Sequence, residues 1–287
     1  MHGWILRMGN SETMLPTNAY TRNRRCAGKR PARDIRVKNE NPGALQLWCA
    51  FPDDLLDPAA AAACAALLNE GERARWQRFR PERSRREYLA THALARTALS
   101  HSRPIAPRDW RFVTNAYGKP APAPECGLRF NLSNSVGLAV CLVVDAPIEV
   151  GVDVEDRSRA AEIADIEYKV FSAAELAQVD ALPETEKPGR YLSLWTLKEA
   201  YIKARGMGMA LPLREISFLF DSAGEVRLEA ADGVDEDASR WRFRRLDYAG
   251  HRIAMVWEGA AGRGLELREA RPPSSPTGLV SAESGVT

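Results

Sequence analysis

Alternating hydrophobic and polar residues mark several short stretches of this chain, and the alternation predicts β-strands. In residues 150–155 valines occupy every second position, so Asp153 and Glu155 are expected together on the opposite face of the strand. Residues 191–202 instead space their apolar side chains every three or four positions, which predicts a packed helix. The same helical spacing places Glu199 and Lys203, four positions apart, on one face.

The predicted elements occur twice in a similar order. The first half has a helix from Tyr88, a strand at 110–114 and a hairpin-like pair at 129–135 and 137–144. The second half has a helix from Tyr191, a strand at 216–220 and a pair at 241–250 and 251–257. This repetition predicts an α/β (α+β) fold of two similar, pseudo-symmetric halves with a ligand site between them.

Charge and composition set the expected boundaries. Residues 1–43 hold nine Lys or Arg against three acidic residues, with little apolar periodicity, so we expect a disordered basic extension. Residues 44–147 then form the N-terminal half, and residues 148–259 form the C-terminal half with the acidic site. Residues 260–287 are rich in Gly, Pro and Ser, which predicts a disordered tail. One alternative is that translation starts later, with Met8 and Met14 as candidate start sites. Another is that the extension is a nucleic-acid or membrane-surface arm.

The composition excludes several classes of protein. No apolar run is long enough to span a membrane, and the first residues lack the apolar segment of a signal peptide. The five cysteines are widely spaced without a C-x-x-C motif, which predicts reduced thiols in a cytoplasmic protein. The four histidines show no paired ligand spacing, so no zinc site is expected.

The acidic strand and the helix carry the candidate chemistry. Asp153, Glu155 and Glu199 would together suit a hard divalent cation that holds a phosphate or pyrophosphate, with Lys203 as an additional positive charge. The alternative is that each segment is a solvated charge ladder. The surrounding valines favour burial, and neighbouring buried carboxylates repel each other unless a cation neutralises them.

Further segments suit a phosphate-rich ligand. An arginine-rich stretch at 72–90 offers guanidinium groups, although most of these are expected to be solvated. The turn at 115–120 contains Gly118 and Lys119, and FNLSNS at 130–135 places small hydroxyl and amide groups on a strand. Gly206 is expected to end the helix that carries Glu199.

Taken in order, these segments resemble the 4′-phosphopantetheinyl transferase family, specifically its larger, Sfp-like (surfactin-synthetase-activating) type. The matching motifs are ERxRxxRF, YGKP, FNLSNS, GVDVE, FS-x-x-E and WTLKEAYIK, and they span residues 72–213. GVDVE followed about forty residues later by WTLKEAYIK is the specific pair. The resemblance implies the two-half fold of that family, with a coenzyme A site between the halves.

The resemblance also implies roles for individual residues. Asp153, Glu155 and Glu199 would hold Mg²⁺, with Mn²⁺ as an alternative, while Glu199 and Lys203 would act in catalysis. The implied coenzyme A contacts are Arg73, Arg75, Arg86, Tyr117, Gly118, Lys119, Pro120, Ser133, Asn134, Asp153 and Lys203. Asn134 departs from the family, which usually has histidine there, so that contact with the 3′-phosphate is expected to be weaker.

The implied reaction transfers 4′-phosphopantetheine from coenzyme A to a serine of an acyl or peptidyl carrier protein and releases adenosine 3′,5′-bisphosphate. The expected partners are the carrier protein and coenzyme A, without nucleic acid or membrane, and a monomer suffices. One rival is a metal-dependent phosphodiesterase or nuclease, which leaves YGKP and FNLSNS unexplained. The other is a nucleic-acid-binding protein that acts through its basic N-terminal arm.

Overall fold

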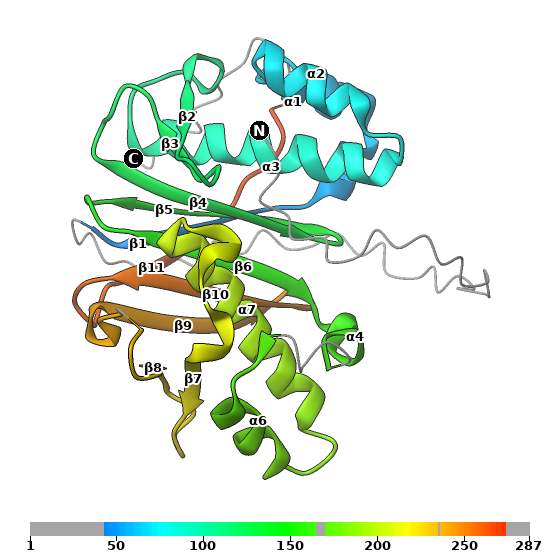
Figure 1. Ribbon diagram of the computed structural model, residues 1–287. Helices are drawn as coiled ribbons and strands as arrows, with labels where there is room; N and C mark the ends of the chain where they lie inside the picture. Colours follow the sequence, from blue (N-terminus) through cyan, green and yellow to red (C-terminus); the bar gives the residue numbers. More distant parts are fainter. Residues whose placement is uncertain (1–42, 165–169, 235, 274–287) are drawn as a thin grey trace, which may run out of the picture.

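The computed structural model describes residues 43–164, 170–234 and 236–273, and it has a four-layer arrangement (Figure 1). Two β-sheets lie in the middle and pack face to face. The long helix α3 covers the outer face of one sheet, and the long helix α7 covers the outer face of the other. The mixed α/β class expected from the repeated elements is confirmed.

The first sheet has the strand order β11-β1-β5-β4. Its strands are β1 (Leu45–Ala50), β4 (Leu128–Ser135), β5 (Leu138–Asp145) and β11 (Leu265–Glu269). The helices on its outer side are α1 (Pro58–Ala65), α2 (Glu70–Arg78) and α3 (Glu82–Ser102), with short 3₁₀ turns η1 (Pro52–Leu56) and η2 (Pro107–Asp109). A small hairpin of β2 (Phe112–Thr114) and β3 (Pro120–Pro122) lies beside them.

The second sheet has the order β6-β10-β9 and is antiparallel throughout. Its strands are β6 (Val150–Asp156), β9 (Trp241–Tyr248) and β10 (His251–Glu258), and a separate hairpin joins β7 (Ile216–Phe220) to β8 (Val226–Ala230). The described helices of this part are α4 (Ala160–Ala164), α6 (Ala173–Asp180) and α7 (Lys187–Arg205). Short 3₁₀ turns complete it: η3 (Arg157–Arg159), η4 (Gly208–Ala210), η5 (Leu213–Glu215) and η6 (Ala238–Arg240).

Strand alternation explains the layers. On β5 the even-numbered residues from Leu138 to Val144 point between the two sheets, while Ala139, Cys141 and Val143 point toward α3. On β6 the valines meet the first sheet, so Gly151, Asp153 and Glu155 are left on the face that carries α7. The expectation that the two acids share a face of this strand is confirmed by their contacts with α7.

Gly151 allows β6 and α7 to pack closely. A Cβ atom added to it would lie 2.0 Å from the carbonyl oxygen of Ala200 and 2.5 Å from the amide nitrogen of Ala204. Ala200 and Ala204 are themselves small and four residues apart, so they present a flat stripe of helix to the strand. This close approach brings the acids of β6 next to Glu199 and Lys203.

The hairpins at 129–144 and 241–257 and the strand at 216–220 form as expected. Gly206 ends α7 in a left-handed conformation, with φ of 63°. The prediction that residues 260–287 are disordered is wrong for 265–269, because these residues pair in parallel with β1. The basic extension at 1–42 lies outside the described residues. None of the helices in the described ranges is long and apolar enough to cross a membrane.

Candidate active site

The two central sheets meet where β4 lies beside β6. Side chains link these two strands, which are not paired by backbone hydrogen bonds. Alternate residues of β4 point across this seam. The Oδ1 atom of Asn131 accepts a hydrogen bond from the Val152 amide at 2.9 Å. The Ser135 hydroxyl accepts one from the Asp156 amide at 3.1 Å. The FNLSNS segment therefore fixes how the acidic strand lies against the first half of the chain.

Ser133, between these two, belongs to a buried charged network. Its hydroxyl donates to Oδ1 of Asp153 at 2.8 Å, and Nζ of Lys203 donates to both groups, at 2.8 Å to the hydroxyl and 2.6 Å to the carboxylate. All three residues are buried. The second oxygen of Asp153, Oδ2, is also buried and has no hydrogen-bond partner in the described part of the chain. Such an oxygen favours a further cation or donor.

Glu155 is held in place on the same side of the strand. It accepts hydrogen bonds from Trp195 Nε1 at 3.2 Å, Arg159 Nη1 at 2.7 Å and the Ser135 hydroxyl at 3.1 Å. Burial and the nearby Asp153 charge raise its pKa in spite of Arg159. The carboxylate is therefore well oriented but short of positive charge.

Glu199 is the most perturbed acid of the site. Burial raises its pKa to about 8, and the charges of Asp153 and Glu155 act in the same direction against the opposing effect of Lys203. Within the described ranges its carboxylate makes no direct hydrogen bond of its own. A buried acid with a pKa near neutrality is the kind of group that exchanges a proton during catalysis.

The donor chemistry of this cluster fits a hard divalent cation. Carboxylate oxygens are the preferred ligands of Mg²⁺, and both the unpartnered Asp153 Oδ2 and the raised pKa of Glu199 indicate missing positive charge. In the described ranges, no three His, Cys, Asp or Glu side chains are grouped so that together they could hold a metal ion. One oxygen of Asp153 is shared with Lys203.

The turn that carries Tyr117, Gly118, Lys119 and Pro120 is tied to the end of α7. Asn115 organises it, since its Oδ1 accepts hydrogen bonds from the amides of Tyr117 and Lys119, both at 2.9 Å. Gly118 adopts a φ of 90°, and Pro120 begins β3. Tyr117 is half-exposed, at 51 %. The turn thus presents an aromatic ring and open backbone.

Lys119 lies at the interface of this turn with the second half of the chain. Its Nζ pairs with Glu149 and donates to the Ala204 carbonyl at 2.7 Å, while Asn115 Nδ2 donates to the Gly206 carbonyl at 2.8 Å. Burial lowers the pKa of Lys119, against the effect of Glu149. These contacts cap the last carbonyl groups of α7.

The structure separates several residues that the resemblance groups around the 3′-phosphate. Ser133 and Asn134 are adjacent on β4, so their side chains point to opposite faces, and Ser133 is engaged by Asp153 and Lys203. Arg73 donates to the Ala65 carbonyl at 3.2 Å, Arg75 lies 6.0 Å from the Tyr88 ring centre, and Arg86 lies 3.9 Å from Asp53. Within the described residues, only Arg86 of these has a buried guanidinium nitrogen without a partner.

Glu72 and Glu175, two other acids of the matching motifs, have structural roles that the sequence analysis did not predict. Glu72 closes a capping box with Asn69 and pairs with the fully buried Arg96 at 2.6 Å. Burial opposes its ionisation, but His92 and Arg96 lower the pKa of Glu72 to about 2. The N-x-x-E pattern at its helix start is a signal that could have indicated this role.

Glu175 and Lys198 form the second such pair, at 2.9 Å with neither side chain exposed. Glu175 closes a capping box with Ser172, and Lys198 donates to the carbonyls of Leu213 and Ile216, both at 2.6 Å. Burial raises the pKa of Glu175 and lowers that of Lys198. Lys198 precedes Glu199 in the chain, yet it anchors the β7 region and does not face the acidic cluster.

Comparison with known proteins identifies the family. The profile of the 4′-phosphopantetheinyl transferase superfamily matches residues 149–256, the segment that holds the acidic cluster. The 4′-phosphopantetheinyl transferase HetI of Nostoc is 32% identical over 170 residues, 58% of this chain and 71% of HetI. The transferase Sfp of Bacillus subtilis is 28% identical over 66% of this chain and 82% of Sfp.

Among solved structures, a holo-(acyl-carrier-protein) synthase from Bacillus anthracis matches 39% of this chain and 96% of its own, with 18% identity and a TM-score of 0.34. The sequence relatives carry the assignment, because HetI exceeds 30% identity over most of its own length. The chain therefore belongs to the 4′-phosphopantetheinyl transferase superfamily.

Proposed function

We propose that this chain transfers the 4′-phosphopantetheine group of coenzyme A to a serine of an acyl or peptidyl carrier protein, and so converts the apo form to the holo form. The relatives named above are transferases of this kind. The observation that carries the proposal is the buried Ser133–Asp153–Lys203 network, with Glu199 on the adjacent turn of α7. It places one ammonium group and an acid of raised pKa at the seam between the sheets.

The reaction exchanges the pyrophosphate (phosphoanhydride) bond of coenzyme A for a phosphoester bond to the carrier serine. The carrier serine oxygen bonds to the β-phosphorus of coenzyme A, while the bond from that phosphorus to the bridging oxygen of adenosine 3′,5′-bisphosphate breaks. Glu199 in its ionised form accepts the serine proton, and the charge of Lys203 favours that form. Lys203 stabilises the negative charge that develops on the leaving oxygen.

Asp153, Glu155 and Glu199 would hold Mg²⁺, with Mn²⁺ as the alternative. When bound, the ion supplies positive charge to the pyrophosphate and orients it. The unpartnered Asp153 Oδ2 and the orienting bonds to Glu155 support this role. Lys203 then remains the protein's own cation at the same carboxylate.

The remaining coenzyme A contacts are proposed around this centre. The Tyr117–Gly118–Lys119–Pro120 turn would lie at the adenosine end, where Tyr117 is exposed. Asn134 with Arg73, Arg75 or Arg86 would approach the 3′-phosphate, while Ser133 faces the Asp153–Lys203 pair from the other side of β4. Of these, Arg86 has the strongest support, because its buried guanidinium nitrogen is unpartnered in the described part of the chain.

One chain supplies both sides of the seam, which supports a monomer with halves at 44–147 and 148–259. Cys49, Cys64, Cys126 and Cys141 are free thiols, which supports a reducing, cytoplasmic compartment. The relatives lend no support to a nuclease or to a nucleic-acid-binding protein.

Intact-mass analysis of an apo-carrier protein tests the function directly. Incubation with the full chain, coenzyme A and Mg²⁺ is expected to add one phosphopantetheine mass to a single serine, and a carrier with that serine changed to alanine should gain none. Hydrolysis of coenzyme A without any carrier modification would contradict the proposal and favour a phosphodiesterase.

A further inference from the structure

Three side chains donate hydrogen bonds to the carboxylate of Glu155, and one of them carries a charge. The Oε1 atom accepts a hydrogen bond from Trp195 Nε1 at 3.2 Å. The Oε2 atom accepts one from the Ser135 hydroxyl at 3.1 Å and one from Nη1 of Arg159 at 2.7 Å. The indole and the hydroxyl each reach one oxygen, so these two neutral donors already orient the carboxylate. What Arg159 adds to the arrangement is its positive charge.

Within the described ranges, Arg159 is the ion-pair partner of Glu155. Arg252 lies opposite Glu155 in the strand register, but its guanidinium group pairs with Asp247 and donates to the Ser193 hydroxyl. The Glu155 side chain is 12% exposed, whereas that of Arg159 is 40% exposed. The contact therefore lies at the rim of the acidic cluster. A half-exposed guanidinium group can leave a carboxylate at small cost, because water solvates it there.

The Arg159 guanidinium group also contacts a second carboxylate. Its Nε atom donates to Glu162 at 3.0 Å, and Glu162 is exposed. Arg159 belongs to η3 and Glu162 to α4, so this contact stays within one short segment, whereas the contact with Glu155 ties that segment to β6. The two contacts use different nitrogen atoms. Arg159 can therefore give up Glu155 and keep Glu162 as its partner.

A divalent cation that binds Glu155 must compete with this ion pair. The Oε2 atom already accepts from both Ser135 and Arg159, which fills its two lone-pair positions. A cation at that oxygen has to displace Arg159. A cation at Oε1 still meets the positive charge of Arg159 across the same carboxylate. At either oxygen, Arg159 opposes the binding of the ion.

We propose that Arg159 is a competing cation that lowers the affinity of Glu155 for a divalent ion, and that Glu162 retains Arg159 when the ion binds. The inference rests on the proposed function, because Glu155 holds the ion there. By thermodynamic linkage, an ion that the Arg159–Glu155 pair weakens must weaken that pair by the same factor, which loosens η3 and α4 from β6. Arg159 acts through Glu155 and is a positioning residue.

The test measures the binding of Mn²⁺ to the full chain from the electron paramagnetic resonance signal of the free ion, with and without coenzyme A. Arg159→Gln is expected to bind Mn²⁺ about threefold more tightly or better, because the competing charge is gone while Trp195 and Ser135 still orient Glu155. Glu162→Gln is expected to bind Mn²⁺ more weakly by a similar factor, because Glu155 is then the remaining carboxylate partner of Arg159.

The double variant Arg159→Gln/Glu162→Gln separates competition from a general effect of charge. If Glu162 acts by holding Arg159, its loss has little effect once Arg159 is gone, so the double variant should bind Mn²⁺ nearly as tightly as Arg159→Gln. Additive effects would overturn the proposal, because each charge would then act on the ion independently. Weaker binding by Arg159→Gln would overturn it too, since Arg159 would then serve to orient Glu155.

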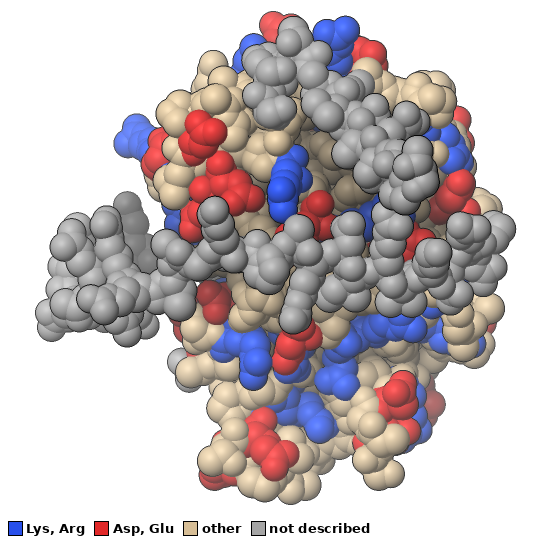
Figure 2. Space-filling model, turned by 180° about the vertical axis from the view of Figure 1, so that it is seen from behind, with Lys and Arg blue, Asp and Glu red and all other residues tan. Residues whose placement is uncertain are grey.

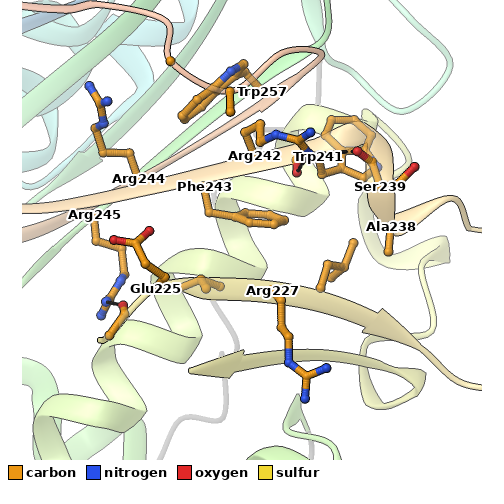
Figure 3. Close-up of a pocket in the computed structure, with 15 residues that line it drawn as sticks. Glu225, Arg227, Ala238, Ser239, Trp241, Arg242, Phe243, Arg244, Arg245 and Trp257 are labelled. Atoms are coloured by element: carbon orange, nitrogen blue, oxygen red, sulfur yellow. Dashed lines mark hydrogen bonds between the residues drawn. The ribbon is translucent and has the colours of Figure 1, made fainter. Parts of the chain in front are cut away.

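Two control variants remove other arginines. They are needed because Lys and Arg side chains gather on the lower half of the molecule seen from behind, the half that holds β9 and β10 in Figure 1 (Figure 2). Arg157→Gln changes the same turn as Arg159, where Arg157 pairs with Asp247 at 3.5 Å. Arg244→Gln changes a residue of β9 that lines a hollow beside β8 (Figure 3). Both controls should leave the Mn²⁺ affinity unchanged.

The binding measurements do not depend on transfer activity, so the two proposals can fail separately. The expected order of Mn²⁺ affinities in a chain that never modifies a carrier would keep the role of Arg159 and reject the enzymatic proposal. Equal affinities of all the variants in a chain that transfers normally would reject the role of Arg159 alone. Absence of Mn²⁺ binding in every variant, with and without coenzyme A, would reject that role together with the metal assignment.

Discussion

The ammonium group of Lys203 lies 2.6 Å from Oδ1 of Asp153, and only about 6% of either side chain is exposed. The pair joins α7 to β6, and the Ser133 hydroxyl joins it to β4. The helix α7 and one strand from each sheet therefore meet at one charged contact. A buried pair of this kind contributes little net stability when it is intact, but it is costly to break from one side.

Lys203→Met should therefore destabilise the protein by about 3–5 kcal/mol, because it leaves the Asp153 carboxylate buried without its partner. The double variant Lys203→Met/Asp153→Asn should recover much of that loss, since no unpaired charge remains. Urea unfolding in EDTA measures both. Strictly additive effects in the double-mutant cycle would show that the two side chains are not coupled in solution.

The raised pKa of Glu199 makes folding depend on pH when no divalent cation is present. Its pKa of about 8 in the folded chain exceeds the ordinary value of 4.5, so the folded state holds a proton that the unfolded state has released. The contribution of Glu199 to the free energy of unfolding is fully present below about pH 4.5 and is lost as the pH rises toward 8. The slope should approach 1.4 kcal/mol per pH unit.

Glu199→Gln is the matched variant for this measurement, because glutamine keeps the shape and cannot ionise. Urea unfolding in EDTA between pH 5 and pH 8 should show a clearly shallower decline for this variant. Parallel curves for the two proteins would mean that Glu199 is already ionised in the folded chain. Transfer activity of Glu199→Gln should be lost at every pH.

Gly151→Ala should destabilise the protein by about 1–3 kcal/mol or more, because the added methyl group meets backbone atoms of α7 that cannot rotate away. Gly189→Ala is the control. Gly189 lies in α7, and a Cβ atom added to it would have no other atom within 4 Å. That change should be neutral or slightly stabilising. Thermal melts of both variants, followed by circular dichroism, decide between these outcomes.

Asn134→His tests the proposed contact with the 3′-phosphate. An imidazolium group supplies a positive charge that asparagine lacks, so coenzyme A should bind more tightly, and more so at pH 6 than at pH 8. Dephospho-coenzyme A should show almost no change. Titration calorimetry with both ligands gives the comparison, and equal gains for the two would place Asn134 away from the 3′-phosphate.

Much of this fold follows from local pattern. The valine alternation at 150–154 gives β6 its two faces, and helical spacing from Tyr191 gives most of α7, so Asp153, Glu155, Glu199 and Lys203 could be grouped from the sequence. Periodicity works here because each element buries one side against a neighbour. The start of α7 at Lys187 was missed, since Pro188 and Gly189 weaken the helical pattern there.

The partners of individual charges could not be predicted in this way. Lys198 anchors the β7 region, whereas Lys203 binds Asp153. The local sequence does not distinguish these two roles, because the partner of each lysine depends on which strand packs on its side of α7. The engagement of Lys119 by Glu149 likewise depends on contacts across the chain. The Gly-, Pro- and Ser-rich context also hid β11, although Leu265 and Leu267 alternate with polar residues as in a strand.

The parallel pairing of β11 with β1 has a consequence for biosynthesis. Leu45 to Cys49 leave the ribosome more than two hundred residues before their partners at 265–269 exist. The β6-β10-β9 sheet and its helix can form earlier, because all of their strands precede residue 259. The nascent chain thus carries an incomplete first sheet until residues 265–269 are made, with β1 as an open edge. A fragment truncated after residue 259 would keep that edge permanently exposed to self-association.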